Sequence, residues 1–282
     1  MQSEVQHFIL TRFNILLWNK DKEGVPVRSR EWLEHRFDLF EKYCLPSIIA
    51  QSCKDFVWIV LFDSTTPDIY KKKIELYQSD CPQLVPVYVE PQNGRYFAQI
   101  FRREVVKRLS FKRIITSYLD NDDALSVRFI EDLQQRVATL LDGTFINYTD
   151  GYQFYTDFKY VMQIQYPRNH FMSVVEEGNP ATLKTIYGYG SHYYIDKIKD
   201  IHIEKIKELP MWCEVIHEKN MGNDAYFLLC AKMIKDENLL FRKFGLKEKV
   251  KSGSCLYLFR FLPRYFKTLL RRVGYRLYGR HW

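Results

Sequence analysis

The feature that most constrains this fold is an alternation of strand-like and helix-like segments through the first half of the chain. The segment 56–63, FVWIVLFD, is a continuous apolar run ending in an aspartate, which is typical of a strand buried on both faces. Further strands are predicted at 5–15, 84–90 and 113–119. Helices are predicted between and after them, at 29–52, 65–78, 96–109 and 126–141. This order predicts an α/β fold with a mostly parallel central sheet and helices on both faces.

The alternation ends near residue 144, and the second half predicts a different arrangement. Residues 144–167 alternate aromatic and polar side chains, which predicts a small antiparallel element of hairpin or edge strands. A loop-rich stretch and two short helices are expected afterwards, at 167–195, 196–208 and 223–235. No linker rich in Gly, Ser or Pro separates the halves, so we expect one domain over 1–241 with a shared core.

Positive charge is concentrated in the predicted C-terminal tail, residues 242–282. The whole chain has 42 Lys and Arg and 34 Asp and Glu, a net charge of +8. The tail has twelve Lys or Arg and one acid, Glu248, so the other 241 residues sum to about −3. A helix after Pro263 would carry one apolar stripe flanked by basic residues. This pattern favours an amphipathic helix on an anionic membrane; a surface for single-stranded nucleic acid and a helix packed on the domain are the alternatives.

Three features of the chain favour a cytoplasmic location. The N-terminal stretch MQSEVQHFILTRFN lacks the basic start, apolar run and cleavage site of a signal peptide. The six cysteines are scattered without a CxxC pair, which indicates reduced thiols. No uninterrupted apolar stretch approaches the length needed to span a bilayer. We therefore expect a cytoplasmic protein, peripheral on the inner face of the cell membrane through its tail.

Three carboxylates are crowded after the fourth predicted strand. The stretch RIITSYLDNDDAL places Asp120, Asp122 and Asp123 directly after residues 113–119. Ligands of open parallel sheets bind beyond the carboxyl ends of the strands, and closely spaced carboxylates are ligands for Mg²⁺ or Mn²⁺. The alternative is a solvated turn in which one Asp caps the next helix. Because uncompensated carboxylates repel one another, we favour a cation site that holds a diphosphate.

The acidic stretch and its surroundings resemble a known group of enzymes. YLDNDDAL is similar to the DxD region of GT-A glycosyltransferases. The ordered segments ILTRFN, WLEHRFDLFEKYCLPSIIAQS, WIVLFD, LDNDDAL, FMSVVEEG and VIHEKN resemble the rhamnosyltransferase family of bacteria, over about residues 7–222. The resemblance implies a GT-A fold, which is a Rossmann-like nucleotide-binding α/β sandwich. It also implies metal-dependent transfer of a sugar, rhamnose or a related hexose, from a nucleotide-diphosphate sugar to a hydroxyl of a glycan or cell-surface polysaccharide.

The resemblance implies a metal site for the DxD region. Asp122, or Asp120 together with Asp122, would hold a Mn²⁺ or Mg²⁺ ion that bridges the donor diphosphate. His217 in VIHEKN would complete that site, since an imidazole suits Mn²⁺; a partly exposed loop histidine is the alternative. Asp123 would lie nearer the sugar or would orient its neighbours, and both Asp120 and Asp123 are expected to contact the donor.

Further residues are implied to hold the rest of the donor. Asp63 and the loop around Thr11 and Arg12 would bind the nucleoside, although Arg12 could equally be a surface residue that snorkels over the sheet edge. Arg95 follows Gly94 in a loop where a guanidinium can meet phosphate.

An inverting transferase also needs a carboxylate to deprotonate the acceptor hydroxyl. Glu176 and Glu177 in FMSVVEEG are the first candidates, because this loop is expected to cover the sugar site. Asp224, ahead of a late predicted helix, is the second candidate; it could equally be the N-cap of that helix. The glutamates could equally belong to an ordinary polar turn. The chain lacks the ED pair usual at that helix in family 2 enzymes, so inversion and retention both stay open.

Two other functions fit parts of the sequence. A nucleotidyltransferase acting on sugar phosphates shares the parallel sheet and the metal-binding carboxylates. It is expected to carry a Gly-rich basic signature after its first strand, and TRFNILLWNK contains no glycine. A nucleic-acid-binding protein would use the basic tail, but the near-neutral to acidic remainder argues against an extended footprint. We therefore expect no nucleic-acid partner.

Overall fold

Four parallel strands form one side of the larger of two sheets. The computed structural model describes residues 5–19, 26–137, 140–217 and 232–251. The four strands are β1 (Val5–Arg12), β2 (Val57–Asp63), β3 (Leu84–Val89) and β4 (Arg113–Tyr118). They lie in the order β4-β1-β2-β3, and each neighbouring pair is parallel. The carboxyl ends of these strands therefore meet at one edge of the sheet.

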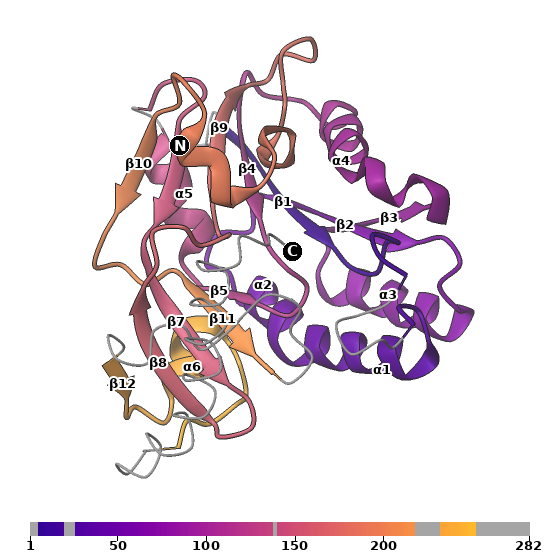
Figure 1. The fold of residues 1–282 in the computed structure, drawn as a ribbon, viewed down its shortest axis with the longest axis vertical. Helices are drawn as coiled ribbons and strands as arrows, with labels where there is room; N and C mark the ends of the chain where they lie inside the picture. Colours follow the sequence, from indigo (N-terminus) through magenta and orange to yellow (C-terminus); the bar gives the residue numbers. More distant parts are fainter. Residues whose placement is uncertain (1–4, 20–25, 138–139, 218–231, 252–282) are drawn as a thin grey trace, which may run out of the picture.

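Three shorter strands extend this sheet beyond β4 (Figure 1). They are β9 (Ser173–Glu177), β6 (Phe145–Tyr148) and β10 (Ile203–Ile206). β9 runs antiparallel to both β4 and β6, and β10 is parallel to β6. The complete sheet has seven strands in the order β10-β6-β9-β4-β1-β2-β3.

A second sheet of five strands lies beside the first, in the lower left of Figure 1. Its order is β12-β8-β7-β11-β5, and its strands are β5 (Ala124–Leu125), β7 (Asp150–Tyr155), β8 (Tyr160–Gln165), β11 (Trp212–Ile216) and β12 (Lys232–Ile234). The chain passes from the larger sheet to the smaller one three times, from β4 to β5, from β6 to β7 and from β10 to β11. A β-carbon at Gly151 would lie 2.2 Å from the Trp212 ring, so the packing of β7 on β11 requires glycine there.

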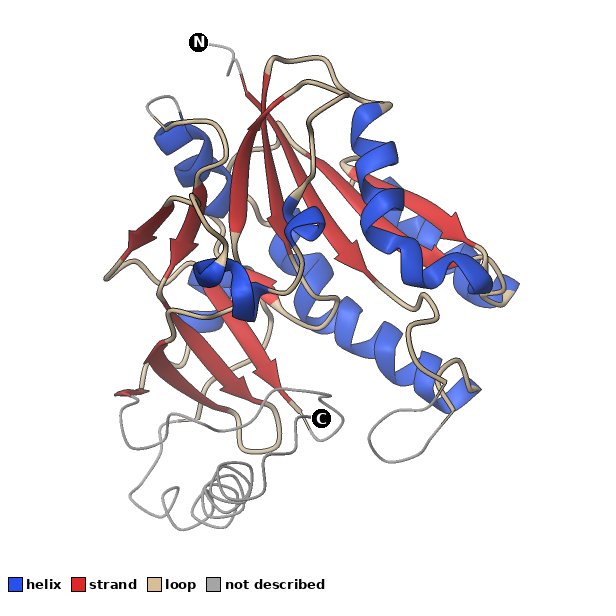
Figure 2. Cartoon of the chain, turned by 45° about the horizontal axis from the view of Figure 1, so that its top comes forward, coloured by secondary structure: helices blue, strands red, loops and turns tan. Residues whose placement is uncertain are grey.

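Helices cover both faces of the larger sheet, as Figures 1 and 2 show. One face carries α1 (Arg30–Leu39), α2 (Leu45–Ile49), α3 (Asp68–Asp80) and α5 (Phe129–Val137). The other face carries α4 (Phe97–Val106), preceded by the 3-10 helix η2 (Pro91–Tyr96), and a second 3-10 helix, η3 (Ile186–Tyr189). Ile9 of β1 packs with the first group while Phe8 and Leu10 pack with the second, as the period-two geometry of a strand requires.

The predicted fold class is confirmed. The structure is α/β, with a mainly parallel central sheet covered on both faces and a separate, mostly antiparallel sheet. The helix predicted at 29–52 is α1 followed by a π-helical turn, η1 (Phe40–Cys44), and α2. It begins at Ser29, whose hydroxyl accepts a hydrogen bond from the backbone N–H of Trp32. The hairpin predicted within 144–167 is formed by β7 and β8.

Two predicted helices are wrong where the structure describes them. Residues 196–208 contain the end of a 3-10 helix, η4 (His192–Lys197), and the strand β10, not a helix. Pairing of β10 with β6 decides this conformation, and a pattern within a short segment cannot report such a partner. The helix predicted at 223–235 falls mainly outside the described residues, but its last part, Lys232–Ile234, is the strand β12.

The predicted boundary between residues 241 and 242 falls inside a helix, α6 (Leu239–Phe244). Leu240 and Phe244 of this helix, and Val250 beyond it, are buried in one apolar cluster with residues of β7, β8 and β11. The packed body therefore extends at least to Val250. The tail helix predicted after Pro263 lies outside the described residues. In the part of the chain that the structure describes, no helix combines the length and apolar character needed to cross a bilayer.

Candidate functional site

The acidic stretch Asp120–Asp123 forms the crossing from the larger sheet to the smaller one. It follows β4 at the shared carboxyl edge of the parallel strands and leads directly into β5. Asp122 and Asp123 are buried there, and Asp120 is partly exposed. A junction of two sheets thus concentrates three carboxylates in a largely water-excluded place, where each needs a specific partner.

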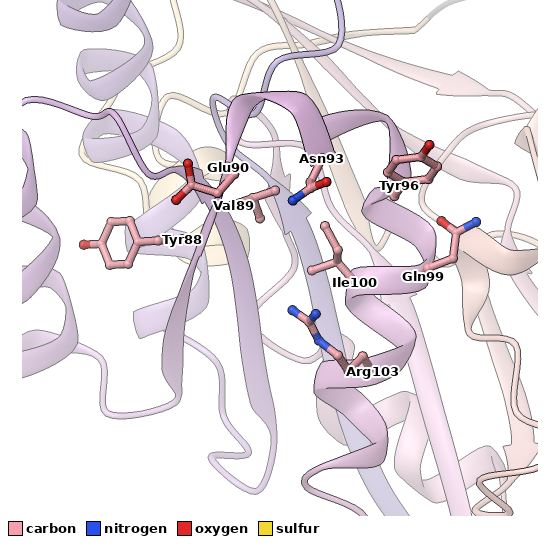
Figure 3. Close-up of a pocket in the computed structure, with 8 residues that line it drawn as sticks. All are labelled: Tyr88, Val89, Glu90, Asn93, Tyr96, Gln99, Ile100 and Arg103. Atoms are coloured by element: carbon pink, nitrogen blue, oxygen red, sulfur yellow. The ribbon is translucent and has the colours of Figure 1, made fainter.

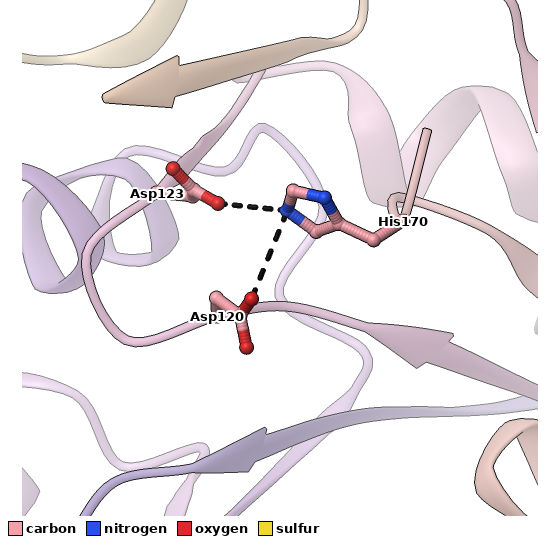
Figure 4. A group of neighbouring side chains, drawn as sticks. All are labelled: Asp120, Asp123 and His170. Atoms are coloured by element: carbon pink, nitrogen blue, oxygen red, sulfur yellow. Dashed lines mark hydrogen bonds and ion pairs between the residues drawn. The ribbon is translucent and has the colours of Figure 1, made fainter. Parts of the chain in front are cut away.

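Two of these carboxylates converge on one imidazole (Figure 4). The Nε2 atom of His170 lies 2.8 Å from Oδ2 of Asp123 and 3.9 Å from Oδ2 of Asp120. One ligand atom from each of the three residues lies within 4.8 Å of the others. The backbone N–H of Val215 in β11 donates to the other oxygen of Asp123 at 2.8 Å, and the Tyr118 hydroxyl donates to Oδ1 of Asp120 at 2.8 Å. Both carboxylates are therefore oriented by the protein.

The electrostatics of this cluster favour a bound positive charge. Burial raises the pKa of Asp123, because the ionised form loses its hydration. Burial lowers the pKa of His170, but the hydrogen bond and charge of Asp123, together with the charge of Asp120, outweigh it and raise that pKa. The Asp123–His170 pair therefore retains a proton near neutral pH. A divalent cation held by these ligands would replace that proton and compensate the carboxylates.

The chemistry of these donors fits Mn²⁺ or Mg²⁺. Two carboxylate oxygens suit either ion, and the imidazole nitrogen favours Mn²⁺. Beside the cluster, Nε of Arg12 is buried and has no hydrogen-bond partner, although another guanidinium nitrogen lies 3.7 Å from Oδ1 of Asp120. A buried donor without a partner is costly, and an anionic ligand next to the cation can accept from it.

Asp122 and His217 were both predicted to bind the metal, and the structure places them side by side. Their neighbour, however, is Arg36 and not the cluster of Asp120, Asp123 and His170. Oδ2 of Asp122 accepts a hydrogen bond from Nη1 of Arg36 at 2.7 Å and lies 3.1 Å from Nε2 of His217. Burial opposes ionisation of Asp122, but Arg36 and His217 lower its pKa below the ordinary value. Asp122 is thus already compensated by the protein. In the described part of the chain, the side chains close enough together to hold one metal ion are those of Asp120, Asp123 and His170.

His170 is the site residue that the sequence did not indicate. It lies between β8 and β9, 47 positions from Asp123, so no short spacing links the two. Its flanking sequence, RNHF, has no ligand pattern. Only the antiparallel return of β9 along β4 brings this segment to the acidic turn.

Thr11 and Arg12 were both predicted to bind the nucleoside, but the structure places them in different environments. The Thr11 hydroxyl is buried and accepts a hydrogen bond from the Trp58 indole at 2.9 Å, so it is engaged within the core. Arg12 lies beside the acidic cluster, and its guanidinium carbon is 4.9 Å, 5.5 Å and 5.3 Å from the ring centroids of Phe97, Tyr118 and Tyr187. Arg12 is therefore a caged cation at the site.

Asp63 ends β2 and borders a separate cavity of about 360 Å³. One of its oxygens accepts hydrogen bonds from the backbone N–H and hydroxyl of Thr65, and the other lies 3.1 Å from Nη1 of Arg28. Asn14, which follows β1, accepts from the backbone N–H of Asp63. The cavity is also lined by Thr66. It lies at the carboxyl ends of β1 and β2, where ligands of parallel sheets bind.

Arg95 lies in η2, between the end of β3 and α4, two residues before Phe97, whose ring packs on Arg12. The Arg95 guanidinium is exposed and lies 4.8 Å from the centroid of the Tyr96 ring. A shallow hollow of about 470 Å³ opens nearby between the end of β3 and α4, lined in part by Tyr88, Asn93 and Tyr96 (Figure 3).

Glu176 and Glu177 lie in strand β9, not in the predicted loop over the sugar site. Glu176 pairs with Ile114, near the amino end of β4. Asp120 lies six positions beyond Ile114, on the order of 20 Å along the strand. Glu176 is buried and Glu177 is exposed. The antiparallel direction of β9 carries both glutamates away from the acidic cluster, whereas Asp224 lies outside the described residues.

Comparison with solved structures finds weak structural similarity, with TM-scores below 0.5. S. aureus TarS matches with a TM-score of 0.38 and 9% identity, over 75% of this chain and 36% of that one. TarS 1–349 in complex with UDP matches with a TM-score of 0.39 and 11% identity, over 75% of this chain and 60% of that one. A "putative nucleotide-diphospho-sugar transferase" from Desulfovibrio desulfuricans G20 matches with a TM-score of 0.37 and 7% identity, over 77% and 84%.

The sequence comparison is more decisive. The chain spans about 36% to 60% of the TarS structures it matches, and no curated protein matches it significantly. The model of one family, described as "Putative rhamnosyl transferase", matches residues 7–226, well over half of the 282 residues. This range runs from within β1 to beyond β11 and includes the whole cluster of Asp120, Asp123 and His170. The chain therefore belongs to this rhamnosyl transferase family.

Proposed function

We propose that the protein is a metal-dependent glycosyltransferase. It transfers a sugar, rhamnose or a related hexose, from a nucleotide-diphosphate sugar to a hydroxyl of a glycan or cell-surface polysaccharide. The observation that carries this proposal is the group formed by Asp120, Asp123 and His170 at the carboxyl edge of the parallel strands. Family membership supplies the reaction class, and the ligand chemistry of this group supports a divalent cation.

Each residue of the cluster has a distinct part in the proposal. A bound Mn²⁺ or Mg²⁺ ion supplies positive charge that stabilises the departing diphosphate. Asp120 and Asp123 each provide a carboxylate oxygen and His170 provides Nε2, and the Tyr118 hydroxyl holds Asp120 in orientation. Arg12 adds a second positive charge, whose unpartnered Nε donates to a phosphate oxygen.

The nucleoside belongs, in this proposal, to the cavity beside Asp63. The carboxylate of Asp63 is held by Thr65 and Arg28, so its direction is fixed before a ligand arrives. Asn14 and Thr66 are joined by a hydrogen bond of 2.9 Å along the same wall. A preorganised polar wall lowers the entropy cost of orienting a nucleoside.

For the general base, we retain Asp224 as the proposed residue. Glu176 and Glu177 are separated from the acidic cluster by the length of β4, whereas a base must lie within hydrogen-bond reach of the acceptor hydroxyl. Asp224→Asn is expected to lower kcat for transfer while leaving the affinity for a nucleoside diphosphate unchanged. An Asp224→Asn variant with unaltered kcat rejects this assignment.

A donor-hydrolysis screen tests the function. A panel of nucleotide sugars is incubated with the protein and Mn²⁺, and the released nucleoside diphosphate is measured. Asp120→Asn and His170→Gln should lose activity, and Asp80→Asn, an exposed acid at the end of α3, serves as the matched control. Release of pyrophosphate from a nucleoside triphosphate and a sugar phosphate would instead identify a nucleotidyltransferase. Activity that survives EDTA unchanged would reject the metal.

We also propose that the basic tail brings the enzyme to an anionic membrane surface, where a lipid-linked or cell-surface acceptor is found. The support is its charge, twelve Lys or Arg against one acid over 242–282. Vesicles with and without anionic lipid provide the test. Deletion of 260–282 should abolish sedimentation with the anionic vesicles and leave the thermal unfolding of the remaining body in place. Equal sedimentation of the truncated and full chains would refute the proposal.

A further inference from the structure

We infer that Glu176 is a positioning residue for the proposed donor site. It holds residues 183–189 against the larger sheet, and this segment keeps Tyr187 on the guanidinium of Arg12. The inference rests on the proposed function, because it concerns how that site is held in place.

The Glu176 carboxylate accepts three hydrogen bonds from residues 184–189. Oε1 accepts the backbone N–H of Lys184 at 2.9 Å and Oε2 accepts the backbone N–H of Thr185 at 2.9 Å. The hydroxyl of Tyr189 also donates to Oε1, at 3.1 Å. Glu176 is 5% exposed, so these bonds form in a largely dry environment. One carboxylate therefore binds the backbone just before η3 and the side chain of its last residue.

The turn before η3 has a strained backbone conformation at Thr185. Thr185 has φ of 65°, in the left-handed region that is unfavourable for a β-branched residue. Its buried hydroxyl has no hydrogen-bond partner. The next N–H, from Ile186, donates to the Thr116 hydroxyl of β4 at 2.8 Å. The carboxylate of Glu176 and the hydroxyl of Thr116 in β4 hold this strained turn from the side of the sheet, and Arg102 of α4 donates to the carbonyl of Leu183 at 2.7 Å.

Tyr187 follows this turn in η3 and packs against three aromatic or basic side chains. Its ring stacks on Phe101 of α4 with centroids 4.9 Å apart and an interplanar angle of 4°. It also lies 4.9 Å from the Tyr118 ring, and the guanidinium carbon of Arg12 is 5.3 Å from its centroid. Tyr187 is thus one wall of the aromatic cage around Arg12.

The aromatic cage around Arg12 is connected to the acidic cluster through Tyr118. Arg12 donates a hydrogen bond to the Tyr118 hydroxyl, and that hydroxyl donates to Oδ1 of Asp120. Displacement of Tyr187 frees the Arg12 side chain and thereby changes the orientation of Asp120. Glu176 acts on the site through these contacts, from roughly 20 Å along the strand direction.

The test uses Glu176→Gln, which keeps the size of the side chain. Its amide can accept only through one oxygen, and its NH₂ group faces a backbone N–H that previously had an acceptor. Glu204→Gln makes the same change at an exposed position of β10 and is the matched control. Affinities are measured by calorimetry for a panel of nucleoside diphosphates with Mn²⁺, and hydrogen exchange is followed by mass spectrometry for the peptide 183–189.

Glu176→Gln is expected to bind the nucleoside diphosphate about tenfold more weakly and to exchange the amides of 184–186 faster. Glu204→Gln should match the wild type in both assays. Glu176→Asp, with the same charge on a shorter side chain, should fall between the two and also covers the case in which the glutamine variant does not fold. Unchanged exchange, or faster exchange with unchanged affinity, overturns the inference.

The same variants distinguish a positioning role of Glu176 from a catalytic one. If Glu176→Gln lowers kcat while nucleoside-diphosphate affinity and amide exchange stay as in the wild type, Glu176 is a general base and not a positioning residue. A double-mutant cycle with Tyr187→Ala should be strongly non-additive for affinity, and additive losses would contradict the proposed route. If the wild type binds no nucleoside diphosphate, the proposed function fails instead.

Discussion

Replacing Asp122 by asparagine separates its two possible roles, metal ligand and internal counter-ion. The structure gives this carboxylate a bond of 2.7 Å from Arg36 and a contact of 3.1 Å with His217. The side chains of Arg36 and Asp122 are only 12% and 11% exposed, so the substitution leaves an uncompensated guanidinium in a poorly hydrated place. Charge-assisted hydrogen bonds contribute about 1.5–3 kcal/mol each, and loss of one partner of a buried ion pair costs about 3–5 kcal/mol. We expect Asp122→Asn to lose about 3–5 kcal/mol of unfolding free energy at pH 7.

The pH dependence of this effect has a defined sign. Arg36 and His217 lower the pKa of Asp122 in the folded state, although burial opposes them. The unfolded-state pKa of an aspartate is about 3.9. The stabilisation is therefore fully present above that value and is lost as the pH falls through the lower folded-state pKa. The difference between the wild type and Asp122→Asn should be full at pH 7 and should shrink below about pH 4.

Urea unfolding measures the stability, and the thermal shift caused by Mn²⁺ measures cation binding. Asp122→Asn should lower the unfolding free energy but keep the Mn²⁺ shift, whereas Asp120→Asn should lose the shift. Asp80→Asn, exposed at the end of α3, controls for removal of a carboxylate. If Asp122→Asn retains wild-type stability and loses the Mn²⁺ shift, Asp122 is the cation ligand and the assignment to Asp123 and His170 is refuted.

Three other substitutions have expected outcomes. Burial lowers the pKa of His7 to about 3, so the unfolded state binds the extra proton and stability should fall by about 1.4 kcal/mol per pH unit from pH 6.5 to pH 5; urea unfolding of His7→Gln should lack this slope. Gly151→Ala places a β-carbon against the buried Trp212 ring and should cost about 1–3 kcal/mol, seen as a lower Tm. Thr11→Val removes the acceptor of the Trp58 indole N–H and should cost about 1–3 kcal/mol, with the calorimetric affinity for a nucleoside diphosphate unchanged.

Each of these outcomes can contradict its premise. Equal pH slopes for His7→Gln and the wild type would place the acid sensitivity elsewhere. A Gly151→Ala protein as stable as the wild type would show that β7 and β11 can separate at no cost. Weaker nucleotide binding by Thr11→Val would restore the predicted role of Thr11 in the nucleoside site.

The first half of the fold could be predicted because its segments have strong local signals. The apolar run that forms β2 and the capped start of α1 at Ser29 define their elements without knowledge of a partner. β10 and β12 could not be predicted in this way. They are short, partly exposed strands, and pairing with β6 and β8 decides their conformation. The crowding of Asp120, Asp122 and Asp123 in sequence made this stretch a candidate site, whereas His170 has no such signal.

The sequence by itself determined the parallel α/β sheet, the place of the acidic stretch at the end of β4 and the resemblance that names the reaction class. Hydrophobic periodicity and short motifs are local properties, so they can be read along the chain. Only the tertiary structure decided how the charges are shared among the side chains. The antiparallel return of β9 carries Glu176 away from the acidic turn, and the segment just before β9 brings His170 to Asp123. Arg36 on α1 compensates Asp122 across 86 positions, a pairing that depends on packing and not on spacing.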